Sequence, residues 1–283
     1  MKANSTLSHK RTFIFMCVFG IITDFQYFCK RFKSMSMSQA IIKKKERRVI
    51  IIQGYSKDDQ EYNIFSATRM SVARYFASIT GGAFDNNEII QITNTTHTLN
   101  KLNDEIDNLT VDIAIFVFMG HGAIQDGKQL FQFSEDEIFY PGQFNYKAPK
   151  TLVLVDSCRV PISGCRVESL SKIIPSFIDG GKFRRPITRA EAKSIYNNAF
   201  TTIADGMTIC FSCSENESAY GFQFLYSLLH KSLKMGVESN KVTFISDLFP
   251  EIHKELSNKN KYSQNPIMVY NNTDFPIALP IYK

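Results

Sequence analysis

Two apolar segments of the chain each end in a side chain that could take part in acyl transfer. Segment 111–119 is followed by Gly-His121-Gly, and segment 151–155 is followed by Asp-Ser-Cys158. A thiol is mostly protonated at neutral pH, but a neighbouring imidazole can take its proton and later protonate a leaving amine. The two side chains therefore predict a cysteine nucleophile served by a histidine.

Glycine beside the histidine supports this interpretation. Gly122 has no side chain, so its backbone can approach a substrate closely, and the amides of Gly122 and Cys158 would together donate to an oxyanion. The simplest alternative is a buried structural cysteine and an unrelated histidine. Because both residues follow apolar runs and glycine flanks His121 on both sides, the sequence favours catalysis.

The segments before these residues have the composition of strands in a parallel sheet. Each is short, continuous and rich in β-branched residues, which is typical of a strand buried on both faces. Further strands are predicted over 48–54, 88–93, 207–212 and 266–270, and a small hairpin over 130–139. Helices are predicted from Asp58 to before Gly81 and over 98–108, 169–177, 219–233 and 242–256. This alternation predicts a mostly parallel sheet with right-handed crossovers, and such sheets bind ligands at the carboxyl ends of their strands.

The order strand-Gly-His121-Gly, then strand-Asp-Ser-Cys158, resembles the caspase and metacaspase clan of cysteine peptidases. Asp-Ser-Cys is the metacaspase-like form, whereas Arg159 directly after the cysteine is similar to animal caspases. The likeness runs from about residue 48 to the C-terminus. It implies a three-layer α/β/α caspase-hemoglobinase-like fold with a central, mostly parallel six-stranded sheet. It also implies a cysteine-type endopeptidase with a Cys158–His121 dyad.

The resemblance divides the chain into parts. We expect an N-terminal extension over 1–46, a large-subunit-like region over 47–178, an exposed linker over 179–206 and a small-subunit-like region of the same domain over 207–283. Members of the clan are zymogens that are cut between the two halves, so the linker is the expected processing segment. Its candidate cleavage sites are Asp179, Lys182 and Arg184.

Specificity in this clan depends on the charge in the primary pocket. A pocket for Lys or Arg needs a carboxylate, and a pocket for Asp needs arginines. Asp156 matches the pocket aspartate of metacaspases, Glu215 and Glu217 are candidate rim charges, and Arg69 would either neutralise Asp156 or line the pocket itself. The resemblance therefore favours cleavage after Arg or Lys. The alternative for Asp156 is a local cap of the turn after its strand.

No cofactor and no metal site is expected. Metacaspases commonly depend on calcium, which needs several oxygen ligands, but the position where that family often offers an aspartate is Cys165 here. The sequence shows no acidic third partner for His121, and a backbone carbonyl is the partner that the resemblance to caspase-like enzymes implies for its ring.

The composition excludes several other classes of protein. Of the 283 residues, 44% are hydrophobic and 21% charged, as in an ordinary globular protein. The net charge of +6 is concentrated in 43–48 and 182–189, where solvated linkers explain it more simply than a nucleic-acid or membrane patch. The six cysteines show neither zinc spacing nor a disulfide framework, so we expect reduced thiols and a cytoplasmic protein. The expected partner is a protein or peptide substrate, and monomer and homodimer both remain open.

The N-terminal segment allows more than one interpretation. Segment 12–23 is apolar and resembles the start of a signal peptide, but it is short, is followed by Asp24 and lacks a clear cleavage site. An extension, or a true start at Met35 or Met37, is expected instead of secretion or anchoring.

The alternative function is a catalytically weak or inactive homologue that regulates or scaffolds an active peptidase. Programmed cell death is the process that the family resemblance implies.

Overall fold

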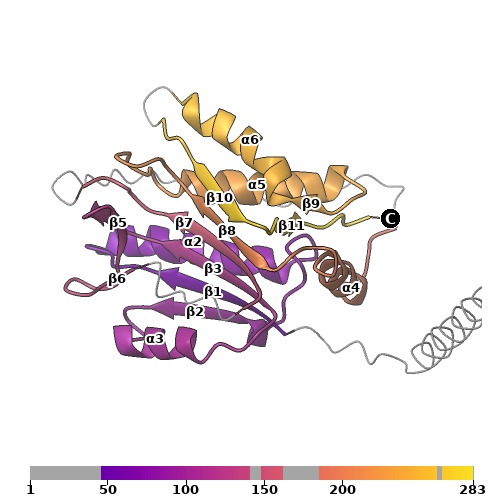
Figure 1. Cartoon of the computed structure of the whole chain (residues 1–283), viewed down its shortest axis with the longest axis horizontal. Coiled ribbons are helices and arrows are strands. Elements are labelled where there is room, and N and C mark those ends of the chain that lie inside the picture. The colour runs from indigo at the N-terminus through magenta and orange to yellow at the C-terminus, as the bar shows by residue number, and fades with distance from the viewer. Residues whose placement is uncertain (1–45, 141–147, 162–184, 260–262, 283) are drawn as a thin grey trace, which may run out of the picture. The chain divides into compact units, whose positions relative to one another are not determined.

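The computed structural model describes residues 46–140, 148–161, 185–259 and 263–282 (Figure 1). Its centre is a six-stranded sheet in the order β10-β8-β7-β3-β1-β2. The strands are β1 (Arg47–Gln53), β2 (Ile89–Thr93), β3 (Ile113–Met119), β7 (Lys150–Asp156), β8 (Gly206–Phe211) and β10 (Ile267–Asn271). All neighbouring pairs are parallel except β10–β8. The expected mostly parallel six-stranded sheet is confirmed.

The continuous apolar runs become strands because both faces of the sheet are covered. Every residue of β3 is buried. Successive side chains point to opposite faces, so Ile115 and Val117 enter one core while Phe116 and Phe118 enter the other. A strand that alternated with polar residues would leave one of these cores open to water.

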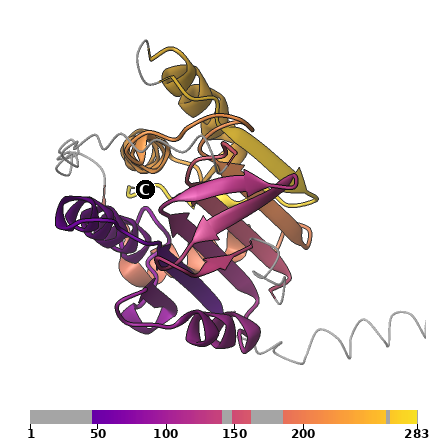
Figure 2. The same ribbon diagram turned by 90° about the vertical axis from the view of Figure 1, so that its left-hand side faces the viewer.

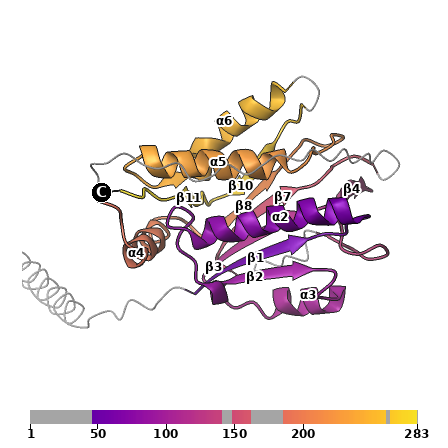
Figure 3. The same cartoon turned by 180° about the vertical axis from the view of Figure 1, so that it is seen from behind.

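Four helices cover one face of the sheet, namely α2 (Asp59–Ala77), α4 (Arg189–Ala199), α5 (Gln223–Glu238) and α6 (Ile245–Ser257). Figure 3 shows α2 and α5 running side by side across this face. The other face is covered by α3 (Leu99–Asp107) and by aromatic side chains of a small sheet, β4 (Gly122–Gln125), β5 (Lys128–Gln132) and β6 (Ile138–Phe139). Phe131 of β5 stacks on Phe118 of β3, with ring centroids 4.0 Å apart. The expected α/β/α arrangement therefore holds, with the small sheet sharing the second layer.

The small sheet follows directly from the end of β3 (Figure 2). The predicted hairpin is confirmed, since Phe131 of β5 pairs with Phe139 of β6. The backbone turns after β3 at Gly120, whose φ of +153° suits glycine. The remaining short elements are a 3₁₀ turn, η1 (Asn86–Glu88), and a two-stranded sheet of β9 (Thr243–Phe244) and β11 (Pro276–Ala278).

A buried ion pair anchors the start of β1. Arg47 donates to the carboxylate of Glu88 at 2.8 Å, and its guanidinium lies 4.1 Å from the ring centroid of Phe84. Glu88 also accepts a hydrogen bond from the amide of Asp85 at 2.7 Å. Since a buried charge needs a partner, this pair stabilises the connection between β1 and β2.

Several boundaries differ from those predicted. The expectation of an exposed linker over 179–206 is wrong in part, because α4 lies within this range and buries Ala192 and Tyr196. The helix predicted over 219–233 begins only at Gln223, since Phe222 adopts a left-handed φ of +55°. The helix predicted over 242–256 begins at Ile245, because β9 takes the two preceding residues.

Other expectations fall outside the part of the chain that the structure describes. They include the extension 1–46 up to residue 45, the helix over 169–177 and the processing candidates Asp179, Lys182 and Arg184. Among the described residues, the helices are too short or too polar to cross a lipid bilayer.

Candidate active site

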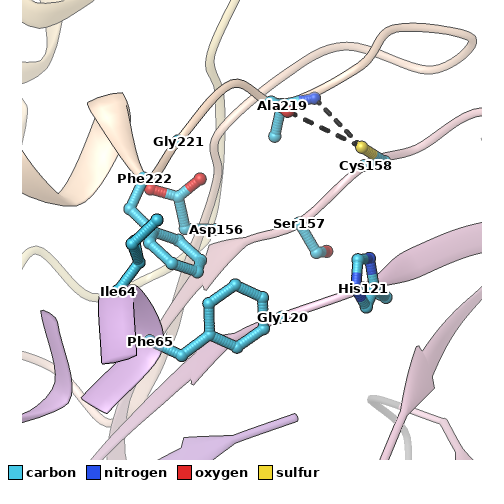
Figure 4. A pocket seen from close by; sticks show the side chains of 10 residues that line it. All are labelled: Ile64, Phe65, Gly120, His121, Asp156, Ser157, Cys158, Ala219, Gly221 and Phe222. Carbon is cyan, nitrogen blue, oxygen red and sulfur yellow. Dashed lines mark hydrogen bonds between the residues drawn. The ribbon is translucent and has the colours of Figure 1, made fainter. Parts of the chain in front are cut away.

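A cavity lies beyond the carboxyl ends of β3 and β7 (Figure 4). The strands end level with each other, because Met119 pairs with Asp156 in the parallel register. His121 and Cys158 each follow two residues after this pair. The lining residues are Ile64, Phe65, Gly120, His121, Asp156, Ser157, Cys158, Ala219, Gly221 and Phe222. The structure therefore brings three of the predicted site residues, His121, Cys158 and Asp156, to one cavity.

His121 is held by an acidic side chain. Its Nε2 lies 3.0 Å from Oε2 of Glu61, and its ring packs against Phe65 with centroids 5.8 Å apart. A backbone carbonyl was the expected partner of the imidazole, and this expectation is wrong for Nε2. Sequence analysis missed Glu61 because it lies 60 positions away on α2. The only signal was Asp58-x-x-Glu61, which marks a helix start and says nothing of a distant imidazole.

The carboxylate of Glu61 is buried, with 2% of the residue exposed. Burial alone would raise the pKa of this carboxyl, but the hydrogen bonds from His121 and from the amide of Lys57 outweigh it and lower the pKa. Glu61 therefore faces His121 as an anion at neutral pH.

The thiol of Cys158 lies against the backbone of Ala219. The amide of Ala219 donates to Sγ at 3.3 Å, and Sγ lies 3.7 Å from the carbonyl oxygen of the same residue (Figure 4). Only 4% of Cys158 is exposed. An amide hydrogen aimed at sulfur stabilises a thiolate, so the loop before α5 contributes to the environment of the Cys158 thiol.

The other two described cysteines have a different environment. Cys210 lies within β8, and burial raises the pKa of its thiol far above the ordinary value. Burial also raises the pKa of Cys213 to about 12. Neither thiol lines the cavity described above, so both have the character of inert core residues.

These differences predict selective alkylation. Treated with iodoacetamide at pH 7, the native protein should be modified at Cys158 well before Cys210 and Cys213, because thiolate is the reactive form. Peptide mapping by mass spectrometry at several times measures this order. Denatured protein is the control and should lose the preference. Equal rates at the three positions in the native protein would contradict an activated Cys158.

Asp156 lies in the wall of the cavity with 1% of the residue exposed. Its Oδ2 accepts a hydrogen bond from the amide of Leu225 at 3.0 Å, while Oδ1 has no partner among the described residues. Burial raises the pKa of Asp156 to about 7, and the Leu225 amide offsets this only in part. The alternative for Asp156 was a cap of the turn after its own strand. Instead, the carboxyl reaches the first turn of α5.

Three of the expected pocket residues lie elsewhere. Arg69 is not among the lining residues, because it lies one helical turn beyond Phe65 and donates back to Ser66 at 3.3 Å. Within the described part of the chain it forms no ion pair with Asp156. The expectation that Arg69 neutralises Asp156 or lines this cavity is therefore wrong.

Glu215 and Glu217 hold the loop before α5 and do not line the cavity. Glu215 is paired with Arg159 at 3.2 Å, and its side chain is 66% exposed. Glu217 accepts hydrogen bonds from the amides of Ser214 and Asn265. The rim consists of Ala219, Gly221 and Phe222 instead.

Arg159 also has a structural place. Its guanidinium lies 4.2 Å from the ring centroid of Phe211 and donates to Gln129 as well as Glu215. Arg159, directly after Cys158, therefore joins the small sheet to the loop before α5.

Gly122 lies next to the cavity, at the start of β4. A Cβ atom at this position would lie 2.7 Å from Oγ of Ser157 and 2.9 Å from Nε2 of Gln129. Only glycine allows the backbone after His121 to pass this close to the segment that carries Cys158. This close approach accounts for the glycine whether or not its amide contacts a substrate.

Comparison with known proteins identifies the family. The sequence matches the model of the caspase domain over residues 47–275, whereas none of the curated proteins matches it. Crystal structures with a similar fold include caspase-1 from Spodoptera frugiperda (11% identity, TM-score 0.49, covering 85% of this chain and 93% of that one). Others are the Drosophila initiator caspase Dronc (11%, 0.47, 87% and 89%) and a protein from Geobacter sulfurreducens (15%, 0.47, 83% and 99%). Since the domain model spans most of the sequence, the chain belongs to the caspase-domain family.

Proposed function

We propose that this protein is a cysteine endopeptidase in which Cys158 is the nucleophile and His121 carries the proton. The observation that carries the proposal is the level ending of β3 and β7, which places both side chains at one cavity. A structural cysteine has no need of a neighbouring imidazole, and in Cys210 and Cys213 burial raises the pKa of the thiol and so disfavours the thiolate.

The proposed reaction has two halves. His121 takes the thiol proton, and Sγ of Cys158 forms a bond to the carbonyl carbon of the scissile peptide. The C–N bond then breaks, and the leaving amine takes the proton from His121. Water attacks the resulting thioester and gives a proton to His121. The C–S bond breaks, the acid product leaves, and the Cys158 thiolate takes this proton back from His121. The amides of Gly122 and Cys158 are the proposed donors to the oxyanion in both halves.

We further propose that the residue before the cut is Arg or Lys. The walls near Asp156 are apolar and include Ile64, Phe65 and Phe222, which suits the aliphatic stem of a long basic side chain. The unpartnered Oδ1 of Asp156 would accept a hydrogen bond from the cationic end. A bound cation also favours the ionised form of a carboxyl whose pKa lies at about 7 without it.

A panel of fluorogenic peptides ending in Arg, Lys, Asp or Asn tests this proposal. We expect hydrolysis after Arg and Lys that Cys158→Ala abolishes, equal in calcium and in chelator. Asp156→Asn should lower kcat/KM for the basic peptides about tenfold or more, because the buried charge is lost. Alkylation of the Asp156→Asn protein is the control and should still modify Cys158 before Cys210 and Cys213.

Other outcomes of the panel decide against parts of the proposal. Thiol-dependent cleavage after Asp alone would reject the basic pocket and keep the peptidase. Silence across a broad panel, with the folded protein tested before and after a deliberate cut in 179–185, would favour the regulatory homologue. Mass spectrometry of the incubated wild type also reports self-processing, for which Asp179, Lys182 and Arg184 are the proposed positions.

A further inference from the structure

We infer that Glu61 is a positioning residue for His121, so that the site works as a Cys158–His121–Glu61 triad. The inference rests on the proposed roles of Cys158 and His121. It concerns a side chain that belongs to neither apolar strand and enters the site from α2.

Hydrogen bonds hold both the backbone amide and the carboxylate of Glu61. It is the third residue of α2, and its amide donates to Oδ1 of the capping Asp58 at 2.8 Å. Its Oε2 accepts a hydrogen bond from the amide of Lys57, also at 2.8 Å. The amino end of a helix favours a negative charge, so this site stabilises a carboxylate even when it is buried.

The contact assigns the two nitrogens of the imidazole. Because Oε2 of Glu61 is an acceptor at 3.0 Å from Nε2, Nε2 carries the ring proton in neutral His121. Nδ1 is then the nitrogen that takes the proton from Cys158. When it does so, His121 becomes a cation beside a buried anion, and the thiolate–imidazolium pair is stabilised over the neutral pair.

The alternative is that Glu61 and His121 form a purely structural contact. Glu88 shows what such a contact looks like, since it also caps a turn and pairs with a buried cation, Arg47, yet neither residue lines the cavity. Among the described residues, the titratable and charged groups around the Glu61–His121 pair are Lys57 and Asp58 just before α2, Asp156 at the end of β7 and Cys158 two residues later.

The test is the rate of Cys158 alkylation by iodoacetamide between pH 5 and pH 10, in wild type, Glu61→Gln and Glu88→Gln. Wild type should show a plateau of reactivity near pH 6.5, as expected of a thiolate–imidazolium pair. Glu61→Gln keeps the size of the side chain and an oxygen that can accept from Nε2, but it removes the charge. It should slow alkylation about ten- to hundredfold at pH 6.5 and approach the wild-type rate at alkaline pH, where an isolated thiol ionises. Glu88→Gln should keep the plateau.

The outcomes separate this inference from the proposed function. A plateau in wild type that persists in Glu61→Gln would overturn the role of Glu61 and leave the dyad intact. A wild type with no plateau would overturn the activated Cys158–His121 pair itself. An equal slowing at every pH in Glu61→Gln would mean that Glu61 acts only on structure. The melting temperature of Glu61→Gln would then fall, as expected for the structural pair in Glu88→Gln.

Discussion

His121→Ala is expected to lower kcat/KM for the best peptide of the panel about 10³-fold. The imidazole takes the thiol proton and returns it to the leaving amine, and acid–base catalysis of this kind contributes about 10²- to 10⁴-fold. In the variant, Cys158 would also be alkylated more slowly at neutral pH, because no base lies beside it. Peptide hydrolysis gives kcat/KM and iodoacetamide labelling gives the alkylation rate of Cys158, both measured on the same preparation.

His97→Ala is the matched control for this variant. His97 lies in the loop after β2, where its Nδ1 is 2.8 Å from Oγ1 of Thr96, and it does not line the cavity. Its removal should leave kcat/KM within about twofold of wild type, as for a surface substitution away from the site. If both variants kept full activity, His121 would have no part in proton transfer.

Asp156→Asn should change how stability depends on pH. The pKa of this carboxyl is raised from 3.8 to about 7 in the folded protein. The folded state therefore binds more protons than the unfolded state between these values, and the contribution of Asp156 to stability is fully present below pH 3.8 and is lost as pH rises through 7. At about 1.4 kcal/mol per pH unit, the free energy of unfolding should fall by up to about 4 kcal/mol across this window.

Asparagine cannot ionise, so the variant should lack this loss. Urea unfolding of wild type and Asp156→Asn at pH 4, 5, 6, 7 and 8 measures the difference. The variant should be close to wild type at pH 4 and more stable at pH 8. The lowered pKa values of Glu61 and Glu88 act with the opposite sign, since their stabilisation is lost as pH falls, and they cancel between the two proteins. Parallel curves for the two proteins would show that Asp156 titrates normally.

The elements that position the site could be predicted from the sequence. A strand buried on both faces leaves a continuous apolar run, and such runs mark β3 and β7 directly. Because the carboxyl ends of parallel strands lie at the same edge of a sheet, His121 and Cys158 could be expected there together. The helix start at Asp58 was also readable, since its capping side chain acts within three residues.

Other features needed the assembled structure. Helix α4 was missed although Thr188 and Glu191 form a capping box, because the glycine- and charge-rich stretch before them indicated a continuous linker. Arg69 was misplaced because the sequence does not show which turn of α2 reaches the cavity. Glu215 and Glu217 were taken for pocket charges, whereas their partners Arg159 and Asn265 come from other parts of the chain.

The sequence by itself determined the sheet, its buried strands and the pair of reactive side chains at their ends. These features depend on hydrophobic periodicity and on residues close together in the chain. Only the tertiary structure decided which acid meets His121, which loop covers Cys158 and why Asp156 resists ionisation. Each of these depends on burial and on groups that come within about 3 Å only after the helices have packed on the sheet, and such contacts leave no pattern along the chain.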